Sequence, residues 1–327
     1  GPEAAHNPQP GTPTPKTLMK LFQTLTLIAA CVWPLGALAA DKKIVLIAGK
    51  PSHGPGAHEH RAGCLLLQKC LAGFPGVKVF VYDGGWPTKQ VDGQTVDNDA
   101  VLEDADAIVI YSDGGAKHPA LGGEHLATLG RQIKRGAGLG ALHYAVEPTK
   151  EKGQAEWLDW IGGAFEINWS VNPHWDGNFK ALPVHAVTRG VKPFTTNDEW
   201  YFNMRFRPGM KGVTPILSDV PPPSTMSRPD GAHSGNPGIR ELVANKTPQH
   251  VMWVTENANG SRGFGFTGGH HHASWQKEDQ RKLVLNAILW LAKVEVPKDG
   301  VASTVTAADM AANLDPKPPA ATKKKKQ

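Results

Sequence analysis

Short, continuous apolar runs separated by amphipathic segments constrain the fold of this chain more than any other feature. The first run, over residues 43–48, reads KIVLIA, which is typical of a strand buried on both faces. Similar runs follow at residues 77–82, 107–111 and 138–142, and helical patterns lie between them over 58–74 and 121–135. Strands that alternate with helices require parallel crossovers, so we predict an α/β fold with a doubly wound, mostly parallel sheet.

The pattern becomes looser after residue 150. Further strands are predicted at 179–182, 199–206, 213–217, 250–255 and 263–267, and a closing amphipathic helix at 277–292. Residues 218–249 are rich in Pro, Gly and Ser, which predicts a long functional or mobile loop. We therefore expect a single large α/β domain over 41–296, followed by a disordered basic tail over 297–327.

The positive charge of the chain lies outside this predicted domain. The net charge is +5, but Lys317 and the four lysines at 323–326 contribute +5 and residues 1–40 contribute +1. Residues 41–316 therefore carry a net charge of −1. A nearly neutral domain lacks the clustered Lys and Arg that phosphate neutralisation requires, so we predict no nucleic-acid partner.

Residues 19–40 have the three parts of a secretory signal peptide. One lysine is followed by an apolar run over 21–32 and by the small-residue sequence Ala-Leu-Ala over 37–39. The apolar run is too short to span a bilayer, so we expect no membrane span. Residues 1–18 are interpreted as an upstream extension. The predicted location is periplasmic or extracellular.

The cysteines allow one alternative for the leader and predict no disulfide. Residues 28–31 also fit a lipobox, in which Cys31 would be lipidated and the protein would be an exported lipoprotein. Cys64 and Cys70 lie six residues apart in a helical pattern, a rise of about 9 Å. That separation exceeds disulfide reach, so we expect two buried thiols.

Histidine clusters follow three of the predicted strands, and the chain has 14 histidines. In open α/β sheets a ligand lies beyond the carboxyl ends of the strands, so these clusters are expected to converge. Several imidazoles at one point suit zinc or another divalent metal ion. The predicted metal ligands are His53, His58, His270 and His272. The alternative is a set of solvated loop histidines or anion-binding donors, since the spacing matches no standard zinc signature.

His143 follows its strand in a segment that resembles a nucleophile elbow. Imidazole there suits acid–base chemistry or metal ligation better than acyl transfer. Glu147 lies one helical turn further on, while Asp198 and Glu199 adjoin two aromatic residues. A carboxylate can orient a histidine or act as its acid–base partner, so we predict these four residues as catalytic. The alternatives are a backbone-bonded loop histidine and an acidic strand end.

Aromatic and polar residues in the loop-rich second half are candidates for substrate binding. Flat aromatic rings pack against the C–H faces of sugars, while His and Arg address hydroxyl groups; core packing is the alternative for each tryptophan. The candidates are His174, Trp175, Trp200, Tyr201, Arg205 and His233. We expect a small-molecule sugar as partner and no nucleotide cofactor.

Five motifs together resemble the trehalose-utilisation (ThuA-like) family. They are Ser52-His53-Gly54, Gly140-Ala141-Leu142-His143, HAVTRG over 185–190, Asp198-Glu199-Trp200-Tyr201 and residues 265–270. The resemblance covers residues 43–292 and implies a flavodoxin-like fold related to class I glutamine amidotransferases, with the site at the elbow. His143 stands where those relatives have a nucleophilic cysteine, so we expect no Cys-dependent amidotransferase activity.

The family association implies sugar catabolism, including that of keto-glycosides. Taken with the residues above, it predicts an exported carbohydrate-processing enzyme, a hydrolase or lyase acting on glycosides or keto-glycosides. Its chemistry would be His/carboxylate acid–base catalysis, with or without a metal. The alternative function is a non-catalytic sugar-binding or accessory protein on the same fold.

Overall fold

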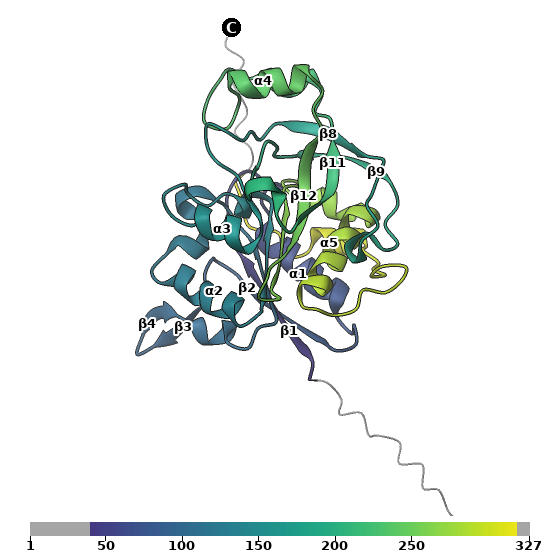
Figure 1. The fold of residues 1–327 in the computed structure, drawn as a ribbon. Coiled ribbons are helices and arrows are strands. Elements are labelled where there is room, and N and C mark those ends of the chain that lie inside the picture. The colour runs from purple at the N-terminus through teal and green to yellow at the C-terminus, as the bar shows by residue number, and fades with distance from the viewer. Residues whose placement is uncertain (1–39, 319–327) are drawn as a thin grey trace, which may run out of the picture. The chain divides into compact units, whose positions relative to one another are not determined.

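The computed structural model describes residues 40–318, which are built around a seven-stranded sheet (Figure 1). The strand order is β11-β12-β13-β6-β5-β1-β2. The neighbouring strands from β13 to β2 are parallel, whereas the β11–β12 and β12–β13 pairs are antiparallel. The strands are β1 (Lys42–Ala48), β2 (Val77–Tyr82), β5 (Ala107–Tyr111), β6 (Gly138–Leu142), β11 (Val213–Asp219), β12 (Gln249–Glu256) and β13 (Arg262–Phe266). The predicted doubly wound, mostly parallel sheet is confirmed.

Helices cover both faces of this sheet and create two hydrophobic cores. In β1 the alternation of side chains sends Ile44 and Leu46 to one core and Val45 and Ile47 to the other. The first core contains residues of α1 and α5, and the second contains residues of α2 and α3 (Figure 1). The helices are α1 (His60–Leu71), α2 (His125–Lys134), α3 (Gln154–Trp160), α4 (Pro237–Ala244), α5 (Glu278–Leu291) and α6 (Ala307–Ala311). Burial on both faces explains why the parallel strands read as continuous apolar runs.

Three small antiparallel pairs accompany the main sheet. They are β3 (Thr88–Val91) with β4 (Gln94–Asp97), β8 (His174–Phe179) with β9 (Phe194–Glu199), and β7 (Gly163–Ala164) with β10 (Arg205–Phe206). The predicted strands at 179–182 and 199–206 are misplaced. β8 ends at Phe179 and β9 ends at Glu199, which are the residues at which the predicted strands begin. As a result, Glu199 closes a strand instead of opening one.

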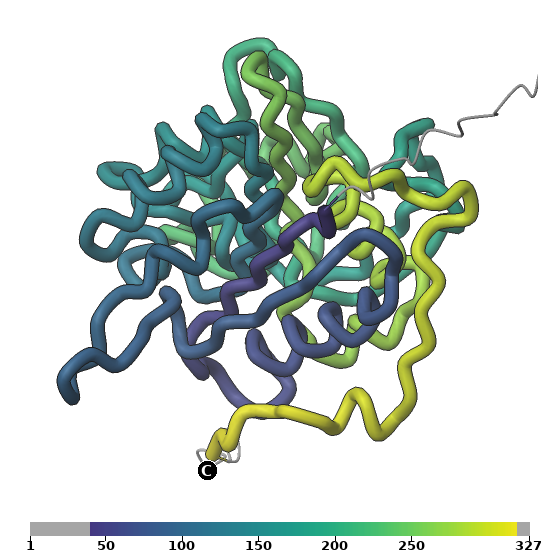
Figure 2. Tube along the Cα trace, turned by 90° about the horizontal axis from the view of Figure 1, so that it is seen from below, coloured from purple at the N-terminus to yellow at the C-terminus, as the bar shows by residue number. Residues whose placement is uncertain are grey.

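Two predictions about irregular segments are wrong. The segment 218–249 is not a continuous loop, since it contains α4, whose first turn is capped by the Asn236 side chain accepting from the Ile239 N–H at 3.0 Å. The tail expected to be disordered from residue 297 is ordered up to 318. Val301 is buried, and Arg281 bonds to Ser303. Residues 301–318, called here the C-terminal strap, run past α1 (Figure 2, yellow end).

Some predictions fall on parts of the chain that are not described. The predicted leader, Cys31 and the lysines at 323–326 lie outside residues 40–318. Within that range no helix is long and apolar enough to cross a bilayer. Cys64 and Cys70 are free thiols; Cys64 is buried as predicted, whereas Cys70 is only half-buried.

Candidate functional site

Four buried side chains from separate elements converge at the carboxyl ends of the strands. His143 opens a 3-10 helix, η4 (His143–Val146), directly after β6, and His270 follows β13. His58 lies in the loop between β1 and α1, and Glu199 is the last residue of β9. All four are less than a tenth exposed. We call these four residues the His/Glu cluster.

The polar atoms of the His/Glu cluster face a common point. Nε2 of His58 lies 3.1 Å from Nε2 of His143 and 3.1 Å from Nδ1 of His270. Oε2 of Glu199 lies 3.0 Å from Nδ1 of His270 and 3.5 Å from Nε2 of His143. One such atom from each residue fits within a 4.8 Å group. The cluster therefore offers three ring nitrogens and one carboxylate oxygen to a single ligand.

Outer hydrogen bonds fix the tautomers of two of these rings. Nδ1 of His143 lies 2.8 Å from the carbonyl oxygen of Thr267, and Nδ1 of His58 lies 2.8 Å from Oδ1 of Asp113. Both oxygens accept, so each Nδ1 donates, and each Nε2 is left to present its lone pair to the cluster. Two lone pairs 3.1 Å apart cannot bond to one another. A shared proton or a cation between the two atoms would bridge them.

The electrostatics of the cluster favour a cation over an added proton. Burial, reinforced by the neighbouring imidazoles, lowers the pKa of His58 far below its ordinary value. Burial alone would raise the pKa of Glu199, but the neighbouring His143 and His270 outweigh it and hold that pKa far below its usual range. An unprotonated His58 ring beside an ionised carboxylate forms a site that suits a positive ion.

The backbone at the site is held in unusual conformations. His53, His58 and His143 have φ angles of 60°, 48° and 55° in the left-handed region that non-glycine residues seldom adopt. In His143 this conformation creates the sharp turn that presents the imidazole at the end of β6. Strain of this kind persists only where the surroundings fix it, and it gathers at functional sites.

The predicted metal ligands divide into three groups in the structure. His58 and His270 belong to the cluster. The ring of His53 stacks on that of His58 with 3.6 Å between centroids, and these two with Asp113 form a second, more open group of donor atoms. The assignment of His272 is wrong. His272 opens the 3-10 helix η8 (His272–Gln276) and lines a separate cavity.

The predicted catalytic residues also separate. His143 and Glu199 meet in the cluster, but Asp198 points the other way along β9 because successive side chains of a strand alternate. The Asp198 carboxylate accepts hydrogen bonds from the backbone N–H groups of Gly269 and His270 at 2.8 and 2.9 Å. It therefore holds the loop that carries His270 and does not face the cluster. We correct its role accordingly.

Glu147 forms an ion pair of its own with His233, at 2.9 Å. The hydrogen bond to Glu147 raises the pKa of His233, and burial raises that of Glu147. The His233 ring also stacks on Phe165. This pair adjoins the cluster without sharing a contact with its donor atoms.

Two of the predicted substrate contacts lie at the cluster. The Tyr201 hydroxyl is 3.3 Å from both Nε2 of His143 and Oε2 of Glu199. His174 is half-exposed, and its Nε2 lies 3.8 Å from Oε1 of Glu199. The exposed ring of His174 marks the side from which a ligand can reach the buried carboxylate.

The remaining candidates have structural roles. Trp175 and Trp200 are core residues with exposures of 3% and 0%, so their assignment to sugar binding is wrong. Their loop-like sequence context hid the fact that they pack between β8, β9 and the main sheet. Arg205 forms two hydrogen bonds to Glu166 and stacks over Trp169 at 3.5 Å, away from the cluster.

Sequence reasoning missed Asp113 and the Thr267 carbonyl, which orient the two histidines. Asp113 stands two residues after β5, at the same edge of the sheet as the histidine clusters, and that position was a usable signal. A backbone carbonyl leaves no trace in residue types, so Thr267 could not have been found.

The chain is similar to known proteins at the level of family and fold. The family model ThuA, described as trehalose utilisation, matches residues 72–291. A putative ThuA-like protein from Bacteroides uniformis ATCC 8492 shares 15% identity and a TM-score of 0.51, covering 79% of this chain and 95% of that one. One from Parabacteroides merdae ATCC 43184 shares 16% identity and a TM-score of 0.50, covering 83% and 99%. A comparison with curated proteins found no match.

Proposed function

This chain belongs to the ThuA family of trehalose utilisation, and from that membership we propose that it is a carbohydrate-processing enzyme whose chemistry takes place at the His/Glu cluster with a divalent metal ion. The observation that carries the proposal is the pair of facing lone pairs on His58 and His143, 3.1 Å apart. A nitrogen-rich set with one carboxylate suits zinc or a similar borderline ion.

The donor set passes a test of size. A tetrahedral zinc site with bonds of about 2.1 Å has donor atoms about 3.4 Å apart. Two separations between histidine nitrogens of the cluster are 3.1 Å, close to this value. Carboxylate and carbonyl groups behind His58 and His143 supply the outer contacts that metal-bound imidazoles normally have. We assign the three histidines as ligands, because catalytic sites keep a fourth position for substrate.

Glu199 and Tyr201 then provide acid–base chemistry beside that position. Glu199 is ionised and can accept a proton. Burial raises the pKa of Tyr201 well above its ordinary value, so its hydroxyl keeps a proton to donate. The hydroxyl lies 3.3 Å from Oε2 of Glu199, which allows the proton to return after each turnover. A bound divalent ion would polarise a substrate carbonyl as a Lewis acid.

Keto-glycosides suit this arrangement because the C–H bond beside a ketone is acidic. Glu199 would take that proton, the electron pair would form a C=C bond, and the glycosidic C–O bond would break. The departing oxygen would receive the proton of Tyr201. This elimination requires one base, one acid and one electrophile, each of which the cluster can provide.

The test measures metal content and turnover together. We expect the purified full chain to bind zinc or a similar ion, and to convert members of a glycoside and 3-keto-glycoside panel in a chelator-sensitive manner. Glu199→Gln should lower kcat by about 10²–10⁴-fold. Glu241→Gln, on the exposed face of α4, is the matched control and should retain activity.

Three outcomes would contradict the proposal. A wild-type protein that binds no divalent ion, or turnover that chelator does not affect, would remove the metal from the mechanism. Calorimetric binding of an intact sugar with no turnover under any metal would instead assign a non-catalytic sugar-binding function.

A further inference from the structure

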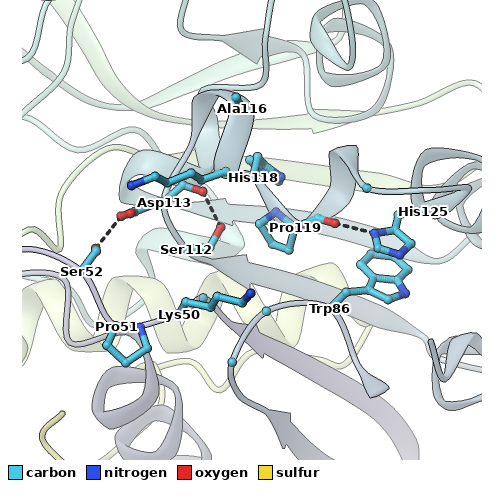
Figure 3. A pocket seen from close by; sticks show the side chains of 15 residues that line it. Lys50, Pro51, Ser52, Trp86, Ser112, Asp113, Ala116, His118, Pro119 and His125 are labelled. Atoms are coloured by element: carbon cyan, nitrogen blue, oxygen red, sulfur yellow. Dashed lines mark hydrogen bonds between the residues drawn. The ribbon is translucent and has the colours of Figure 1, made fainter. Parts of the chain in front are cut away.

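A cavity of about 540 Å³ lies beside the His/Glu cluster at the point where the strand order reverses. From β1 the chain crosses to β2 on one side, and β5 lies on the other side. Loops that leave β1 and β5 in opposite directions open a crevice, which is where open α/β sheets bind ligands. The cavity is lined by residues 49–52 and 84–86 and by several residues between 112 and 125 (Figure 3). Its volume is typical of small-molecule sites.

One carboxylate connects the cavity to the cluster. Asp113 lines the cavity, and its Oδ1 accepts hydrogen bonds from Ser52 Oγ at 2.7 Å and from His58 Nδ1 at 2.8 Å. Within residues 40–318, Oδ2 of Asp113 has no hydrogen-bond partner. A molecule in the cavity can therefore contact the group that orients His58.

The charges that line the cavity favour an anion. Lys50 and Lys117 contribute two ammonium groups, whereas Asp113 is the only carboxylate among the lining residues that the structure describes. Neither lysine has an ion-pair partner in the described part of the chain. In Figure 3 the Lys50 side chain extends toward Trp86, whose indole stacks on His125 with 4.0 Å between centroids. One cavity thus combines cationic groups with an aromatic wall.

We propose that this cavity binds an anionic sugar unit, carrying a carboxylate or a phosphate, as the non-reacting part of the substrate. The lysines would pair with the anionic group and the Trp86 wall would contact the ring. This inference rests on the proposed function for the choice of a sugar, and it narrows the substrate class to acidic glycosides.

Calorimetry on the metal-depleted full chain tests the cavity independently of catalysis. Methyl glucuronide and glucose 6-phosphate represent the two anionic groups, and methyl glucoside and inorganic phosphate are the controls. We expect the anionic sugars to bind, and binding to weaken at least tenfold in Lys50→Gln/Lys117→Gln. Lys180→Gln/Lys211→Gln removes the same charge from exposed sites and should have no effect.

The other results overturn the inference in distinct ways. If methyl glucoside bound equally well, the cavity would not require a charged group. If inorganic phosphate bound equally well, the cavity would not recognise the sugar ring. No binding of either anionic sugar would dismiss the cavity as a sugar site. None of these outcomes depends on metal or turnover, so they test the cavity independently of the proposed function.

A second inference comes from the C-terminal strap, which reaches the loop that carries His58. Lys317 and Glu59 form an ion pair of 3.1 Å with side-chain exposures of 3% and 1%. Lys317 Nζ also donates to the carbonyls of Ala57 and His58, the latter at 3.2 Å. The Asp315 backbone N–H donates to the other oxygen of Glu59 at 2.8 Å.

These contacts fix a strained residue. His58 has a φ of 48°, and its N–H donates to the His270 carbonyl at 2.9 Å. Its own carbonyl accepts from Lys317, so the strap holds the peptide group that follows His58 and the His270 loop holds the one that precedes it. Glu59 completes the loop by accepting the Gly56 N–H at 2.9 Å. We infer that Lys317 is a positioning residue for His58.

Amide hydrogen exchange of the full chain tests this inference without any metal. Lys317→Met should speed exchange over residues 56–59 by at least tenfold, while Lys69→Met should not. Lys69 is the control because it forms the exposed ion pair of the same strap, with Asp309. Glu59→Gln/Lys317→Met leaves no unpaired buried charge and serves if the single variant unfolds.

Zinc titration of the same variants supplies the second measurement. Zinc affinity should fall with Lys317→Met and recover in part with Lys317→Arg. Unchanged exchange over residues 56–59 in both Lys317→Met and the double variant would overturn the positioning role. Zinc binding by the wild type reports on the proposed function separately.

Discussion

Asp113 decides which nitrogen of His58 faces the cluster. Its carboxylate accepts from Nδ1 at 2.8 Å and leaves Nε2 as the inward donor. A ligand histidine without this outer contact can rotate or change tautomer. Sites of this kind lose metal affinity by about 10–100-fold when the outer partner is removed.

We therefore predict that Asp113→Ala lowers zinc affinity about 10–100-fold, as measured by competition with a chromogenic chelator. Asp113→Asn should have a smaller effect, because its amide oxygen can still accept from Nδ1. Asp104→Ala, an exposed acid paired with Lys43, is the control. Wild-type affinity in Asp113→Ala would show that the carboxylate does not orient the ring.

His118 makes a pH-dependent contribution to stability at the residue scale. Its ring accepts the Ala120 N–H at Nδ1 and lies 3.0 Å from the Ala145 carbonyl at Nε2, which fixes a neutral tautomer. Burial lowers its pKa to about 4. Folding favours the neutral ring, so the contribution is complete above the unfolded pKa of about 6.5 and is lost as pH falls toward 4.

Between pH 7 and pH 5 this loss should amount to about 2 kcal/mol of unfolding free energy. Urea unfolding at both pH values measures it. His118→Gln should be less stable than wild type at pH 7 but should lose less stability on acidification. Equal losses in the two proteins would mean that His118 titrates normally in the folded state.

At the scale of elements, α4 shows how a cap can create a helix in a segment that composition marks as a loop. The Asn236 side chain accepts a hydrogen bond from the Ile239 N–H. Pro237 occupies the first helical turn, where a backbone N–H has no partner within the helix, so the N–H that proline lacks is not missed. The same residue types that suggested a loop are those that start the helix.

Removal of this cap should be measurable. We predict that Asn236→Ala lowers the unfolding free energy by about 1 kcal/mol, with a shorter protected region in α4 by hydrogen exchange. Asn245→Ala, at the other end of α4 and without a side-chain cap bond there, is the comparison. An equal loss in both variants would argue against a specific contribution from the cap.

At the scale of the whole molecule, the C-terminal strap belongs to the folded domain. Val301 is 1% exposed and packs in the core that contains α1 and α5. The motif-based boundary at residue 296 therefore cuts through a packed region, although the family match also ends before it, at 291.

Truncation of one strap side chain tests this contribution. We predict that Val301→Ala lowers the unfolding free energy by about 2 kcal/mol, measured by urea denaturation. Val184→Ala, at a fully exposed valine, should change stability by less than about 0.5 kcal/mol. If the two variants were equally stable, the strap would not form part of the cooperative core.

The sequence by itself determined the sheet and the edge at which the site lies. Continuous apolar runs specify parallel strands with two covered faces, and the histidines at their ends identify the edge at which the His/Glu cluster lies. Those signals are local, so they can be read from neighbouring residues. His143, His58 and His270 were candidates for this reason, and Glu199 was a candidate because a carboxylate can act as the acid–base partner of a histidine.

Only the tertiary structure decided which candidates meet. Asp198 and Glu199 are adjacent in sequence yet lie on opposite sides of β9. His270 and His272 diverge because His272 already belongs to the 3-10 helix η8 (His272–Gln276). The partners of His58 and Glu59 come from positions 113 and 317, which no local pattern connects. Side-chain direction and long-range contact follow from the packing of the whole chain, and residue types alone do not specify them.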